Sequence, residues 1–129
     1  MVAVAINNSK VDNISNDKVA EIIKSQPTCI DFSKFLIEEF DFSHSELESL
    51  MAQNTSFVRC NFSSSDLSGA NFSRATVLDG EFNDAKLIKS EAYRCYLAGA
   101  IFDGANIQRP SSKIIYWKVQ VGMTLKNKT

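Results

Sequence analysis

The sequence predicts an all-β repeat fold in which short coils stack on one another, and two periodicities in the chain carry that prediction. Eleven consecutive five-residue blocks run from Thr55 to Arg109, each with a small first residue and an apolar third residue. The first residues are Thr55, Cys60, Ser65, Ala70, Ala75, Gly80, Ala85, Ser90, Cys95, Ala100 and Ala105, and the third residues are Phe57, Phe62, Leu67, Phe72, Val77, Phe82, Leu87, Ala92, Leu97, Phe102 and Ile107. A period of five matches neither a helix nor a flat strand. It matches a solenoid, whose units are too small to bury their apolar faces alone.

The second periodicity, of twenty residues, predicts how the blocks stack. Third residues twenty apart form four series: Phe42, Phe62, Phe82 and Phe102; Leu47, Leu67, Leu87 and Ile107; Ile37, Phe57, Val77 and Leu97; and Phe32, Ala52, Phe72 and Ala92. Four blocks therefore make one square coil, and successive coils lie about 4.8 Å apart, at strand spacing. We expect the first and third residues to point inward, so that like aromatic rings stack.

Individual blocks resemble a known motif. Ala70-Asn-Phe-Ser-Arg74, Ser65-Asp-Leu-Ser-Gly69 and Cys60-Asn-Phe-Ser-Ser64 are similar to the A-(D/N)-(L/F)-x-x repeat of pentapeptide-repeat proteins. The resemblance covers residues 55–109 closely and the preceding 25 residues loosely. It implies a right-handed quadrilateral β-helix. The motif is specific for this fold and says little about function, because the family uses the repeat as a scaffold for different functions.

Four segments are predicted along the chain. Residues 1–28 form an N-terminal segment with a short capping helix, which Ser15 begins and Pro27 ends. Residues 29–54 form an irregular first coil, residues 55–109 the regular β-helix, and residues 110–129 a C-terminal cap or dimerisation segment. Each open end of a solenoid needs such a cover.

The first coil has a helical alternative. The five-residue register continues back to Ile30, but its first positions hold large residues, namely Ile30, Phe35, Phe40 and Leu50. Ser45-Glu-Leu-Glu48 also has the pattern of a helix capping box. We favour the irregular coil.

The C-terminal segment is predicted to contain a strand. Apolar and polar residues alternate strictly from Ile115 to Lys126, which is typical of a half-buried strand. This strand either caps the last coil or joins two subunits. Related pentapeptide-repeat proteins often dimerise through their C-terminal ends, so we expect a homodimer with its interface at Ile115, Trp117, Val119 and Val121.

The sequence contains no catalytic constellation, and we expect no enzyme activity, no cofactor and no metal site. His44 is the single histidine and takes an outward fifth position. An acidic patch of Glu38, Glu39, Asp41, Glu46 and Glu48 is best explained as a solvated outer face. Cys60 and Cys95 take inward small positions, where a thiol packs as a compact apolar group. Unpaired cysteines fit a reducing cytosol.

Charge is distributed unevenly along the chain. The formal charge is −5 over residues 1–54, zero over 55–109 and +4 over 110–129, which add to −1. The best-known activity of the resembling family is that of an acidic, DNA-shaped dimer acting on DNA gyrase. A neutral repeat region departs from that pattern, so DNA mimicry toward gyrase or another DNA-binding protein is the alternative function. We expect no membrane segment, and the few basic residues make direct nucleic-acid binding a weaker hypothesis.

One side of the predicted coil suggests a partner surface. Outward positions there hold Val58, Leu78 and Ala98, with Tyr96 beside them, and no charge. A contiguous apolar column marks an interface, although the N-terminal segment of the same chain is an equal candidate to cover it. The sequence therefore predicts a cytoplasmic, non-enzymatic protein–protein interaction scaffold for an unknown protein partner. A secreted bacterial effector module is a second alternative.

Overall fold

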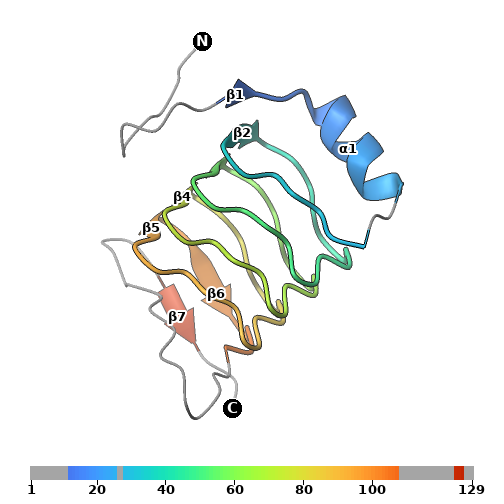
Figure 1. Cartoon of the computed structure of the whole chain (residues 1–129). Coiled ribbons are helices and arrows are strands. Elements are labelled where there is room, and N and C mark those ends of the chain that lie inside the picture. Colours follow the sequence, from blue (N-terminus) through green and yellow to red (C-terminus); the bar gives the residue numbers. More distant parts are fainter. Residues whose placement is uncertain (1–11, 26–27, 108–123, 127–129) are drawn as a thin grey trace.

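The computed structural model describes residues 12–25, 28–107 and 124–126. Their elements are β1 (Asp12–Asn13), α1 (Asn16–Lys24), β2 (Phe35–Glu38), β3 (Ser56–Val58), β4 (Thr76–Leu78), β5 (Tyr96–Ala98), β6 (Ile101–Asp103) and β7 (Thr124–Lys126). Strands β1 to β5 form one parallel sheet in chain order, and β6 pairs in parallel with β7. The chain winds as a stack of square coils, with α1 beside the first of them (Figure 1).

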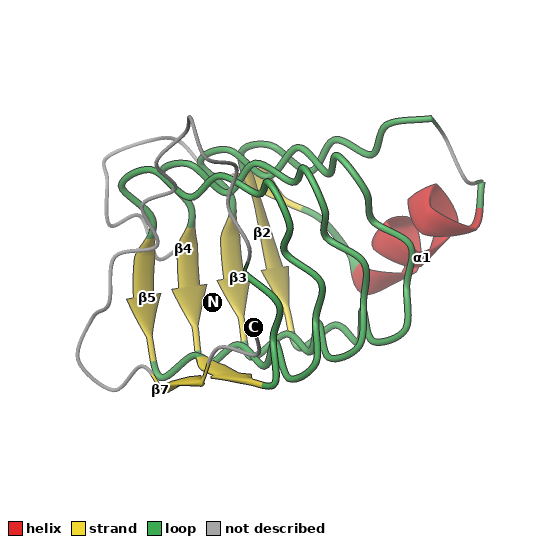
Figure 2. Cartoon of the chain, turned by 90° about the horizontal axis from the view of Figure 1, so that it is seen from below, coloured by secondary structure: helices red, strands yellow, loops and turns green. Residues whose placement is uncertain are grey.

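The twenty-residue coil is confirmed by the strand register. Phe57 pairs with Val77, and Val77 with Leu97, so each strand of the sheet lies beside the strand one coil later. The other three sides are held by isolated parallel bridges with the same spacing, for example Asp41 to Asn61, Glu46 to Asp66 and Asn71 to Glu91. Figure 2 shows β2 to β5 lying side by side along one side of the stack.

The interior is a set of side-chain columns. Phe42, Phe62, Phe82 and Phe102 are fully buried. Their rings stack in sequence, with centroids 4.7, 4.9 and 4.7 Å apart and interplanar angles of 3°, 12° and 4°. This separation matches the strand spacing, so the backbone repeat and the aromatic stacking support each other.

The small first residues are also buried, and the polar ones among them are satisfied. The hydroxyls of Ser65 and Ser90 donate to the carbonyl oxygens of Phe62 and Leu87, at 2.6 and 2.8 Å. Thr55 donates to the carbonyl of Phe32 at 2.8 Å. A hydroxyl bonded in this way enters the apolar interior without the cost of an unpaired polar group.

Residues at the second and fifth positions shape each corner. The Asn or Asp side chain at the second position accepts a hydrogen bond from the backbone N–H two residues later, as Asn61 does from Ser63 at 2.9 Å. Every fifth residue from Lys34 to Gly104 has a positive φ. Non-glycine residues rarely adopt this left-handed region, so the ladder of the neighbouring coils must hold the backbone there.

The first coil belongs to the β-helix. Fifth positions 34, 39, 44 and 49 have the same positive φ as the later corners, and bridges join Asp31 to Met51 and Glu46 to Asp66. No helical turn occurs at Ser45. The large first residues are accommodated in two ways: Ile30 and Leu50 are buried, whereas Phe35 and Phe40 are half-buried, and the ring of Phe40 lies 4.5 Å from that of Phe42.

Helix α1 covers the N-terminal end of the stack. Ser15 caps it, with its hydroxyl oxygen accepting the N–H of Lys18 at 3.1 Å. Val19 is fully buried in the core, and Ile22 and Ile23 pack against it. The side chain of Asn16 donates to the carbonyl oxygen of Glu38 at 3.1 Å, which ties the helix to the end of β2.

The C-terminal strand lies at the other end. Strand β7 pairs with β6 through Ile101 and Thr124, a step of 23 residues where the regular coil has 20. The predicted dimer residues Ile115, Trp117, Val119 and Val121 lie outside the described residues, so the homodimer stays a prediction.

Candidate functional site

The predicted partner face lies on the outside of β3, β4 and β5, and its two ends differ. Val58 is buried, at 6% exposed, and the neighbouring outward residues Ser56 and Thr76 are buried as well. Leu78 and Ala98 are half-buried, whereas Tyr96 is 40% exposed. Other protein atoms therefore cover the Val58 end, and the accessible part of the face consists of Leu78, Tyr96 and Ala98. The N-terminal residues 1–11, which we considered as a cover, lie outside the described residues.

An exposed aromatic that the sequence analysis missed adjoins this face. Tyr93 is 49% exposed and takes the fourth position of its block, so its ring points outward. The guanidinium of Arg94 lies 5.2 Å from the centre of the Tyr93 ring, within cation–π range. The signal was present in the sequence as Tyr93-Arg94-Cys95-Tyr96, with only the cysteine pointing inward.

The predicted acidic patch is spread around the first coil. All five carboxylates are exposed, but they lie on three different sides of the square. Glu39 pairs with Arg59, Oε2 to Nε at 3.0 Å. The side chain and backbone N–H of Ser43 bond the carboxylate of Asp41 and lower its pKa. Within the described part of the chain, no group of three His, Cys, Asp or Glu side chains is placed to hold a metal ion.

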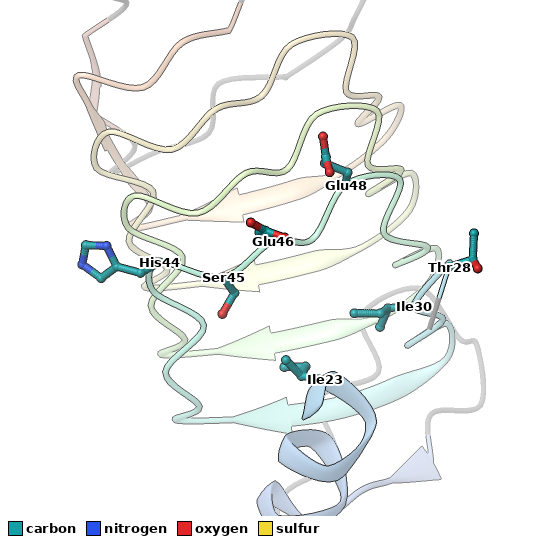
Figure 3. Close-up of a pocket in the computed structure, with 7 residues that line it drawn as sticks. All are labelled: Ile23, Thr28, Ile30, His44, Ser45, Glu46 and Glu48. Atoms are coloured by element: carbon teal, nitrogen blue, oxygen red, sulfur yellow. The ribbon is translucent and has the colours of Figure 1, made fainter. Parts of the chain in front are cut away.

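A pocket of about 560 Å³ opens where α1 leaves part of the first coil uncovered. It is lined by Ile23, Thr28, Ile30, His44, Ser45, Glu46 and Glu48. Its volume is in the range of small-molecule sites. Figure 3 shows that His44 points out of the coil, away from Glu48 and Ile23, so the titratable side chains do not converge on one point.

The two inward cysteines are packing residues. Cys60 and Cys95 are each 1% exposed, while Cys29 is exposed. Burial raises the pKa of the Cys60 thiol to about 11 and that of Cys95 to about 12. Since the thiolate is the reactive form, neither side chain is a nucleophile near neutral pH.

These two thiols should make the protein sensitive to alkali. Above the ordinary cysteine pKa of 9.0, the unfolded chain loses their protons while the folded chain keeps them, so the free energy of unfolding falls as pH rises toward 11. Each thiol contributes a slope of at most about 1.4 kcal/mol per pH unit. Denaturant unfolding from pH 8 to 11 measures the fall. The double variant Cys60→Ala, Cys95→Ala should show a shallower curve, and parallel curves would contradict the assignment.

Part of the chain matches a known repeat family. A family model described as pentapeptide repeats matches residues 40–76 with eight copies. Two solved structures that match are trypsin-treated variants of QnrB1, a plasmid-mediated fluoroquinolone resistance protein. The first has a TM-score of 0.34 and 11% identity over 60% of this chain and 68% of that one. The second has a TM-score of 0.28 and 20% identity, and this chain spans 44% of its length.

No curated protein sequence matches the chain. In the described ranges, no helix has the length and hydropathy needed to cross a membrane.

Proposed function

Because this chain is a pentapeptide-repeat protein, we propose that it is a non-enzymatic scaffold that binds another protein through outward side chains of its β-helix. Phe62, Phe82 and Leu87 are fully buried and fill the interior between the coils. A partner protein can therefore contact only the outward residues, which are the second, fourth and fifth residues of each block.

The observation that carries this proposal is the surface over β4 and β5. Leu78, Tyr96 and Ala98 form an uncharged outward group, and Tyr96 keeps 40% of its surface exposed. Tyrosine is enriched at the centres of protein interfaces, because its ring supplies contact area and its hydroxyl a hydrogen bond. An exposed apolar group with such an anchor is suited to a protein partner.

Site-specific photocrosslinking tests this surface. We expect a photoreactive phenylalanine analogue at position 96 to crosslink a protein from cells that produce the chain. The same analogue at position 86, where Lys86 is exposed on another side of the square, is the matched control. The proposal fails if positions 96 and 86 crosslink the same set of proteins.

Acidic DNA mimicry directed at gyrase has less support from the charges. Residues 55–109 carry six basic and six acidic side chains. Arg59, Arg74 and Arg94 take fifth positions at the corners, and their charge is opposite to that of a phosphate mimic. A gyrase supercoiling assay separates the two functions.

A further inference from the structure

The corners of the coil stack differ in charge, and one of them combines three cations with no acid. Fifth residues twenty apart share a corner, and the four corners carry Lys34, Asn54, Arg74 and Arg94; Glu39, Arg59, Asp79 and Gly99; His44, Ser64, Asp84 and Gly104; and Ser49, Gly69 and Lys89. The first of these, the basic corner, holds three cations. With coils about 4.8 Å apart, its four residues span about 14 Å.

The end of the basic corner near β5 is flanked by exposed aromatic rings. Tyr93 and Tyr96 precede and follow Arg94 and are 49% and 40% exposed, and they account for two of the three large hydrophobic side chains that are exposed in the described ranges. The Arg94 guanidinium carbon lies over the Tyr93 ring, 5.2 Å from its centre, which is within the range of a cation–π contact. Thus a cation and two exposed tyrosines lie at or beside one corner of the stack.

Arg94 contacts an aromatic ring, whereas three other basic side chains form ion pairs. Lys18 pairs with Glu21, Arg59 with Glu39 and Lys86 with Asp66, and Arg94 is in none of these three pairs. An arginine held against an aromatic ring presents a planar fork that fits a carboxylate in bidentate fashion.

We propose that the basic corner, together with Tyr93 and Tyr96, binds an acidic segment of a protein partner. This inference rests on the proposed scaffold function and names the chemistry of what the scaffold binds. The partner's carboxylates lie against Arg94, and its apolar side chains contact Tyr96 and the neighbouring Leu78. Tyrosine and arginine together are the residue types that dominate binding energy at protein interfaces.

A peptide fits this surface better than single-stranded nucleic acid does. Glu91 lies on the side that ends at Arg94, and Asp79 is at the far end of β4, so a continuous row of phosphates would meet negative charge on both sides. The repeat region as a whole carries no net charge to attract a polyanion. A polypeptide carries its acids on separate side chains and can place them only over the corner.

Fluorescence anisotropy with defined probes tests the proposal on the full chain. The probes are a fluorescein-labelled acidic peptide of repeating Glu-Glu-Leu, the same peptide with Gln for Glu, and an oligothymidine of equal length. We expect saturable binding of the acidic peptide that weakens with salt, and at least tenfold weaker binding of the other two probes. Arg94→Glu should lower the affinity for the acidic peptide at least tenfold, and Tyr93→Ala should lower this affinity as well.

Lys89→Glu is the matched control, because it makes the same charge change at a fifth position on another corner. It should change affinity less than twofold, and circular dichroism should show that all variants keep their fold. The proposal is overturned if the acidic peptide does not bind, or if Arg94→Glu and Lys89→Glu lower its affinity equally. It is also overturned if the oligothymidine binds more tightly than the acidic peptide. The crosslinking experiment separates this proposal from the scaffold function. If position 96 crosslinks a specific protein and Arg94→Glu does not change that crosslinking, the acidic-segment proposal is overturned while the scaffold function stands.

Discussion

Replacing Phe82 by alanine should lower the free energy of unfolding by about 3–5 kcal/mol, the range for truncating a fully buried phenylalanine. Phe82 is 0% exposed and lies in the middle of its column, with ring centroids 4.9 Å from Phe62 and 4.7 Å from Phe102. Its ring also meets Phe72 edge-on at 6.1 Å. The cavity therefore lies between two coils whose backbone bridges resist collapse, which places the expected loss in the upper part of that range.

Equilibrium denaturant unfolding measures the change. Tyr96→Ala is the matched control, since it also removes an aromatic ring but from a side chain that is 40% exposed, and it should cost less than about 1 kcal/mol. A loss below about 1 kcal/mol for Phe82→Ala would contradict the stacked column.

Enlarging a small first residue should also destabilise the β-helix. Ala85 is 1% exposed, and its place in the square leaves room for the large third residues, such as Phe82 and Leu87, that share the interior with it. Ala85→Leu adds three carbon atoms to a filled space and should cost about 1–3 kcal/mol through side-chain strain and backbone shifts.

The neighbouring residue provides the control for that change. Lys86 is exposed, and its ion pair with Asp66, Nζ to Oδ2 at 3.8 Å, is solvated and contributes little. Lys86→Leu should therefore stay within about 0.5 kcal/mol of the parent protein. Thermal unfolding of both variants checks the prediction, and equal losses would show that the inward and outward positions are wrongly assigned.

The sequence by itself determined the coil, its length and its interior. Small residues at position one and apolar residues at position three recur because only these sizes fit a square interior, so Phe62, Phe82 and Phe102 could be placed in one stacked column from spacing alone. The helix that Ser15 begins could also be predicted, because its signal is local and depends on the residues that follow.

Only the tertiary structure decided which outward side chains remain accessible. Val58 and Tyr96 belong to the same predicted partner face, yet Val58 is 6% exposed and Tyr96 is 40% exposed. Equivalent positions differ as well, because Ser56 and Tyr96 are both second residues of their blocks and Ser56 is 3% exposed, so the repeat period alone does not determine exposure. The contact of Arg94 with Tyr93 likewise depends on how side chains turn at a corner.

The contacts at the two ends of the stack could not be predicted from the repeat pattern, and the physical reason is the same at both ends. A block inside the stack has a copy of itself on either side, so its environment is implied by the period. The first coil instead meets α1, whose Val19 fills the core, and so tolerates large residues such as Phe40. The last coil meets β7 after 23 residues rather than 20. Contacts of this kind join segments that share no repeat, and they exist only once the chain has folded.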